Sequence, residues 1–204
     1  MARTGGDITR KKILAVAEKI FSEKGFDGTS IQNISSAAGV NKALIYYHFK
    51  NKQDIIDSLF SQTLEEMFCL VGSSQEQLDQ SFHKAGAAER INDIVSFLSK
   101  RKGILSVMLM ESLKNEQSGH ISLFKCAEMI ISRNVDDMLV ALKEKCNTDI
   151  SREELMVHEF FTGFLPIVFF SLFKEKWAAY FNCEQGKLVE LFSKVFKESH
   201  IQHD

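Results

Sequence analysis

Apolar residues recur with a period near 3.6 along almost the whole chain, and this spacing predicts helices rather than strands. A first helix is expected to begin at Asp7 or Thr9 and to end at Gly25. Beyond residue 50, helices are expected over residues 51–71, 88–101, 103–115, 120–146, 151–181 and 185–199. Residues 73–87 are polar and give the weakest signal. The predicted fold class is all-α.

Two short helices between the first helix and residue 51 are joined by a tight turn. Ser30 can cap the earlier one, Gly39 ends it, and the later one starts at Asn41. Glycine supplies the turn, and Val40 is placed to fill the space between the two helices. This arrangement is typical of a helix-turn-helix, although corners between short helices occur in many proteins.

The helix predicted over residues 151–181 is apolar in every direction. Such a helix must be buried on all sides, so we expect it to pair, together with the last helix, with the same helices of a second copy. The predicted assembly is a two-fold dimer joined by a four-helix bundle. A central core helix in a monomer would bury the same surface. Pro166 predicts a kink near Gly163.

Charge is divided unevenly along the chain. The 204 residues carry a formal net charge of −2. Residues 1–52 hold nine Lys and Arg against four Asp and Glu, whereas residues 53–204 hold sixteen against twenty-three. A basic N-terminal segment on an acidic body favours nucleic acid or another anionic surface as the partner of that segment.

Several classes of protein are disfavoured. The N-terminus lacks the apolar region of a signal peptide, which predicts a cytoplasmic protein, and the longest uncharged apolar run, residues 160–173, is too short to span a membrane. The four cysteines have no metal-site or redox spacing, so we expect them to be buried and reduced, with no metal or cofactor. Glu154 and His158 are spaced i, i+4 and do not form the E-x-x-H pair of a di-iron enzyme.

Residues Thr29 to Lys52 read TSIQNISSAAGVNKALIYYHFKNK. This segment closely resembles the helix-turn-helix signature of TetR-family transcriptional regulators, with its capped second helix, A-G-V turn, Y-Y-H-F recognition helix and N-K start of the fourth helix. The resemblance extends back to Thr9. It implies a three-helix DNA-binding domain over residues 1–52 and a helical ligand-binding and dimerisation domain over residues 53–204.

The chemistry of the exposed side chains agrees with this resemblance. Tyrosine hydroxyls and an imidazole suit phosphate oxygens, while Lys42, in the first turn of the recognition helix, is the best candidate for a guanine contact. Gln32 could reach an adjacent base or phosphate. The predicted DNA-binding residues are Ser30, Gln32, Asn41, Lys42, Ala43, Leu44, Tyr46, Tyr47, His48 and Lys52. We expect at least one of the two tyrosines to bury its ring against the first helix.

Two positions depart from the usual pattern of the family. Ala43 stands where glycine is common, and its methyl limits how closely the backbone can approach the groove. Leu44 stands where a small polar residue is usual and cannot hydrogen-bond a base. Leu44 either contacts a thymine methyl or packs against Tyr47 or His48 and reads nothing.

The resemblance implies a regulator that binds a palindromic operator in double-stranded DNA as a homodimer, and it implies no enzymatic activity. We expect a repressor that is released when an apolar or aromatic small molecule shifts the fourth helix. The predicted pocket residues are Met108, Glu111, Glu128, Phe160, Phe161 and Phe164. Ordinary core packing or surface exposure explains these residues equally well. An architectural DNA-binding protein without ligand control and a ligand-dependent activator are the alternatives.

Overall fold

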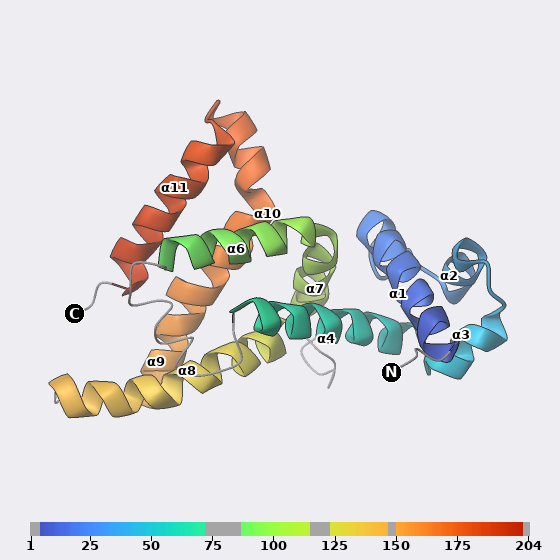
Figure 1. Cartoon of the computed structure of the whole chain (residues 1–204), viewed down its shortest axis with the longest axis horizontal. Helices are drawn as coiled ribbons and strands as arrows, with labels where there is room; N and C mark the ends of the chain where they lie inside the picture. The colour runs from blue at the N-terminus through green and yellow to red at the C-terminus, as the bar shows by residue number, and fades with distance from the viewer. Residues whose placement is uncertain (1–4, 72–86, 115–122, 147–149, 202–204) are drawn as a thin grey trace. The chain divides into compact units, whose positions relative to one another are not determined.

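Every regular element in the described part of the chain is a helix, which confirms the all-α prediction (Figure 1). The computed structural model describes residues 5–71, 87–114, 123–146 and 150–201. The predicted weak stretch, residues 73–87, lies outside them except for its last residue. Contacts divide the chain into two compact units, residues 1–65 with 101–123 and residues 66–100 with 124–204. A functional boundary at residue 52 stays a prediction.

The first unit is built around one long helix. It contains α1 (Gly5–Lys24), α2 (Ile31–Ala38), α3 (Lys42–His48), most of α4 (Lys52–Val71) and α7 (Lys102–Lys114). The buried stripe of α1 consists of Ile13, Leu14, Ala17 and Phe21. Both α2 and α7 pack against α1, and α3 packs against α2. This packing presents α2 and α3 as one short-helix pair (Figure 1).

The expected start of α1 at Asp7 or Thr9 is wrong, because the helix already begins at Gly5. Asp7 therefore lies in the first turn rather than at the cap. A carboxylate is favourable in either place, since the N-terminal end of a helix carries partial positive charge.

The close packing of α7 on α1 depends on a glycine. A Cβ atom added at Gly103 would overlap the side chain of Ser22. Arg101, just before α7, forms an ion pair with Glu18 of α1 at 3.6 Å. The two helices therefore approach each other more closely than side chains would permit at this point.

The second unit contains α6 (Ala87–Lys100), α8 (Leu123–Cys146, from Phe124 on), α9 (Arg152–His158), the π-helical segment η1 (Glu159–Phe164), α10 (Leu165–Tyr180), α11 (Gln185–Phe196) and the π-helical segment η2 (Lys197–Ile201). Helix α10 packs against both α6 and α11 (Figure 1). Polar contacts support the packing, because the Ser99 hydroxyl donates to the Ser171 carbonyl at 3.3 Å and the Ser193 hydroxyl donates to Asn92 Oδ1 at 3.0 Å. One side of α10 is therefore covered by α6 and α11.

The helical run from Arg152 to Tyr180 is irregular where Pro166 predicted a kink. Residues 159–164 wind as a π-helix, and α10 starts directly after them, with Pro166 in its first turn. Proline has no N–H to donate and its ring collides with the carbonyl four residues earlier, so a local change of winding relieves the conflict. This run of 29 residues is long and apolar enough to cross a membrane, which by itself is weak evidence that it does.

The expectation that all four cysteines are buried is wrong. Cys69 is exposed and Cys183 is half-buried, while Cys126 is buried and all three are free thiols. Burial raises the pKa of Cys126 to about 12, since a thiolate is poorly solvated there. The side chain of Cys146 lies outside the described residues.

Candidate nucleic-acid interface

The turn between α2 and α3 is defined by local hydrogen bonds. Gly39 has φ +62° and ψ 39°, the left-handed conformation that ends a helix, and its N–H donates to carbonyls of α2. Val40 N–H donates to the Ser35 carbonyl at 3.0 Å. Asn41 then caps α3, because its side-chain oxygen accepts from Leu44 N–H at 2.7 Å. The predicted helix-turn-helix is therefore present, with both helix ends capped.

Helix α3 is held on the unit by an inner apolar edge. Ile45 and Phe49 are spaced i, i+4 and are almost completely buried. Lys42, Ala43 and Asn41 at the start of the helix are exposed. Burial of one edge leaves the first turn free to face a partner, as a recognition helix requires.

Both tyrosines of α3 point into solvent. Tyr46 is 55% exposed and Tyr47 is 80% exposed, so the expectation that one ring is buried against α1 is wrong. His48, which follows the two tyrosines, is half-buried, and its ring lies near Gly6 of α1. The same ring meets the Tyr47 ring edge-on, with 5.0 Å between the ring centroids. Leu44 is also half-buried. The tyrosine hydroxyls are thus available to a ligand outside the protein.

The N-terminus of α2 is closed by a capping box. Asn33 N–H donates to Ser30 Oγ at 3.1 Å, and Ser30 N–H donates to Asn33 Oδ1 at 3.0 Å. The Ser30 hydroxyl also donates to Asn33 Oδ1 at 2.7 Å. Exposed Gln32 donates to Ser36 Oγ at 2.9 Å. The role of Asn33 was not predicted from the sequence, although its position three residues after Ser30 is a local signal for a capping box.

Lys52, at the start of α4, is anchored on the turn between α1 and α2. Its Nζ lies 4.1 Å from the centroid of the Phe26 ring and donates to the Phe26 carbonyl at 2.8 Å. An ammonium has three donors, so Lys52 still has hydrogen-bonding capacity for a phosphate. The Phe26 ring also stacks on Phe21, with 5.9 Å between centroids. No local signal connects Phe26 to Lys52, because the two residues are far apart in sequence.

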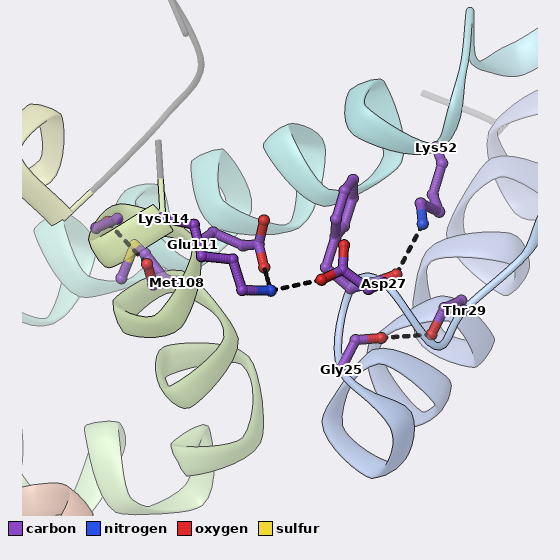
Figure 2. Close-up of polar contacts among 9 residues, drawn as sticks. Gly25, Asp27, Thr29, Lys52, Met108, Glu111 and Lys114 are labelled. Atoms are coloured by element: carbon purple, nitrogen blue, oxygen red, sulfur yellow. Dashed lines mark hydrogen bonds and ion pairs between the residues drawn. The ribbon is translucent and has the colours of Figure 1, made fainter. Parts of the chain in front are cut away.

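The same turn is tied to the end of α7 (Figure 2). Lys114 Nζ contacts Asp27 Oδ2 at 2.6 Å and Glu111 Oε1 at 3.0 Å. The hydrogen bond from Lys114 and its charge hold the pKa of the Asp27 carboxyl below its ordinary value. Within the turn, the Thr29 hydroxyl donates to the Gly25 carbonyl at 2.7 Å. The segment that leads into Ser30 is therefore constrained from several sides.

The predicted pocket residues fall into two groups. Met108 is buried in α7, and Glu111 beside it bonds Lys114 in the first unit. In the second unit, Phe160 stacks on Phe164 at 5.9 Å and meets Phe161 edge-on at 5.0 Å. Glu128 is exposed on α8. The structure thus brings the three phenylalanines together, and the wider pocket stays a prediction.

The fold and the capped turn define a class of protein: an all-helical chain with an N-terminal helix-turn-helix of the DNA-binding kind. Residues 13–59 match the family described as bacterial regulatory proteins, tetR family. The N-terminal part of the chain is therefore a helix-turn-helix domain of the TetR family of transcriptional regulators.

Two curated relatives illustrate where the similarity lies. The chain is 44% identical over 52 residues to the transcriptional regulator AcrR of Shigella flexneri, a match that covers 26% of this chain and 24% of AcrR. It is 33% identical over 92 residues to the transcriptional repressor NicS of Pseudomonas putida, which covers 45% and 41% of the two chains. The matches therefore span less than half the length of these relatives.

Similarity of fold extends further than similarity of sequence. The structure of the transcriptional regulator FadR from Bacillus subtilis in complex with stearoyl-CoA superposes with a TM-score of 0.53 at 20% identity, covering 91% of this chain and 96% of FadR. The second unit therefore shares its helical architecture with a solved regulator.

Proposed function

We propose that the protein is a sequence-specific repressor that binds a palindromic operator as a homodimer and releases it when a small apolar or aromatic molecule binds. The observation that carries this proposal is the capped helix-turn-helix, with the first turn of α3 and both tyrosines facing solvent. The relative NicS is a named repressor, which supports repression as the direction of control.

The DNA contacts follow from the positions of the side chains. Lys42 and Asn41 stand at the exposed start of α3, where a recognition helix meets base edges. Tyr46, Tyr47 and His48 stand at its other end and suit phosphate oxygens. Ser30, Gln32 and Lys52 flank the helix from α2 and α4. In this arrangement Lys42 reads sequence and the tyrosines set the position of α3 on the duplex.

Dimerisation is supported by the uncovered side of α10. Its buried residues include Ile167, Val168 and Ala178, whereas its exposed side carries an aromatic stripe of Phe169, Phe173, Trp177, Tyr180 and Phe181. Large contiguous apolar patches of this kind mark protein interfaces. Leu191 and Val195 on α11 are exposed as well. A second copy would cover both helices and would bring two recognition helices into one molecule, as a palindromic operator requires.

The effector is assigned to the second unit because its aromatic side chains are incompletely buried. Phe160 and Phe164 are only partly buried. They pack against the core formed by Ala127, Ile131, Val135 and Leu155. The FadR structure, which holds stearoyl-CoA, supports the view that this helical architecture can accommodate a molecule with a long apolar part. A ligand acts only if it prefers the arrangement that does not bind DNA.

The proposal is tested by selecting duplexes from a random pool with the purified protein. The affinity for the selected duplex is then compared with that for scrambled DNA at fixed salt. We expect a palindromic sequence that binds at least about a thousandfold better than scrambled DNA. Lys42→Ala should relax the preference at one base position in each half-site, and Tyr47→Ala should weaken binding to all duplexes alike.

Lys19→Ala is the matched control, because it removes one positive charge from an exposed position on α1 and leaves α3 unchanged. Binding without any preference would contradict sequence reading and favour an architectural protein. Affinity that rises when a ligand is added would contradict release by the ligand. The first outcome rejects the proposed repressor. The second rejects the proposed direction of control, in which the ligand releases the protein from DNA.

A further inference from the structure

The recognition helix is joined to α4 by a three-residue linker, Phe49-Lys50-Asn51, which begins at the residue that caps the end of α3. Its residues are bonded to the first turn of α4. Lys50 N–H donates to Asp54 Oδ2 at 2.8 Å, and Asp54 N–H donates to Asn51 Oδ1 at 2.8 Å. Phe49 N–H donates to the Ile45 carbonyl at 2.9 Å and closes α3. The linker is therefore fixed from the side of α4.

Arg10 of α1 contacts the same linker from the other side. Its guanidinium carbon lies 5.0 Å from the centroid of the Phe49 ring, and its Nη2 donates to Ser58 Oγ at 3.0 Å. Phe49 is only 2% exposed, so its ring cannot turn away without leaving the core. The Ser58 hydroxyl in turn donates to the Asp54 carbonyl at 2.7 Å. One guanidinium thus joins α1, the end of α3 and the second turn of α4.

We propose that Arg10 is a positioning residue for operator recognition, which holds the linker between α3 and α4 in the conformation that aims Lys42 at the bases. This inference rests on the proposed function. A planar guanidinium can stack on an aromatic ring and donate a hydrogen bond in its own plane at the same time. The ammonium of a lysine is a compact point charge and cannot make both contacts equally well. Arg10 therefore acts through Phe49 and Ser58 and does not itself contact a base.

A direct phosphate contact by Arg10 makes different predictions. Neutralising one phosphate contact lowers affinity for all duplexes and reduces the slope of log affinity against log salt by about one. Lysine replaces arginine well in that role. A positioning residue affects the ratio of operator affinity to scrambled-DNA affinity, because base contacts carry that ratio and phosphate contacts do not.

The experiment measures both affinities over a range of salt for wild type, Arg10→Met, Arg10→Lys and Ser58→Ala. Lys11→Met is the matched control, because Lys11 is the exposed neighbour on α1 and loses the same charge. We expect Arg10→Met to lower the operator-to-scrambled ratio about tenfold with the salt slope unchanged. Arg10→Lys should recover little of the loss, Ser58→Ala should lose part of the ratio, and Lys11→Met should keep it.

Amide hydrogen exchange supplies a readout without DNA. Arg10→Met should speed exchange of Lys50 N–H, and circular dichroism should show the variant folded; if it is not folded, Ser58→Ala carries the test. An unchanged ratio, or an equal loss for all duplexes with a reduced slope and full recovery in Arg10→Lys, overturns the inference. A wild-type protein without a preferred duplex overturns the proposed function instead.

Discussion

At the scale of single residues, Gly39 is one of two glycines in the described part of the chain with a left-handed backbone, the other being Gly25. The φ of Gly39, +62°, lies in the left-handed region, which costs other L-residues about 1–2 kcal/mol. We expect Gly39→Ala to lower the free energy of unfolding by about 1 kcal/mol or more, measured by urea denaturation. Gly186→Ala is the control, since Gly186 lies in the first turn of α11 without a left-handed φ, and the same change there should not destabilise the protein. Equal effects at the two glycines would contradict this account.

Asp27 carries a pH dependence whose sign is set by Lys114. Because the hydrogen bond from Lys114 lowers the pKa of folded Asp27, the ion pair contributes to stability above the unfolded pKa of about 3.9. That contribution is lost as the pH falls through the lowered folded pKa. Asp27→Asn should therefore have a slightly lower urea midpoint than wild type at pH 7, and the two midpoints should converge as the pH falls below the unfolded pKa.

The control for this comparison is Glu23→Gln, which removes a carboxylate from an exposed position of α1. Any change in the urea midpoint that this variant shares with Asp27→Asn reflects the loss of a surface carboxylate rather than the loss of the contact with Lys114. A gap between Asp27→Asn and wild type that persists in acid would show that Lys114 does not depend on the carboxylate charge.

At the scale of elements, the contact between α1 and α7 depends on the absence of a side chain at Gly103. Gly103→Ala would push a methyl into Ser22, and overpacking of this kind costs about 1–3 kcal/mol. We expect a lower melting temperature for this variant. Ser22→Gly should relieve the overlap, so the double variant should lose less than the two single losses added together. Additive losses in the double-mutant cycle would place the strain elsewhere.

The ends of α2 and the start of α3 could be predicted from local residues, whereas the start of α1 could not. Ser30, Gly39 and Asn41 mark helix ends by local hydrogen bonding, and the structure has ends at these residues. The irregular winding of residues 159–164 shows the limit of such reasoning. Pro166 indicates that a regular helix is interrupted nearby, but whether it kinks or rewinds as a π-helix depends on the neighbours that pack around it.

At the scale of the whole molecule, the proposed dimer makes the stripe on α10 decisive. Trp177 is 46% exposed on that stripe, so Trp177→Glu would place a charge in the proposed interface. We expect wild type to sediment as a dimer at micromolar concentration and Trp177→Glu to sediment as a monomer. Lys19→Glu, at an exposed position of α1 and outside both helices of the proposed interface, adds the same carboxylate and should stay dimeric. A monomeric wild-type protein would end the dimer proposal.

The local features of this protein could be deduced from its sequence alone. The helical period, the caps of α2 and α3 and the inner edge of α3 depend on residues within one or two turns of each other, and such interactions can be deduced from spacing alone. The outward position of Lys42 follows once Ile45 and Phe49 are recognised as the buried edge. The candidate DNA-binding residues of α3 can therefore be named from local sequence.

Other features were decided only by tertiary structure. The contacts of Arg10 with Phe49 and Ser58, of Lys52 with Phe26 and of Lys114 with Asp27 join residues far apart in the sequence, and no local spacing encodes them. The placement of α7 in the same compact unit as α1 is of this kind as well. Periodicity states which side of a helix is apolar, but the partner that covers that side is chosen by the packing of the whole chain.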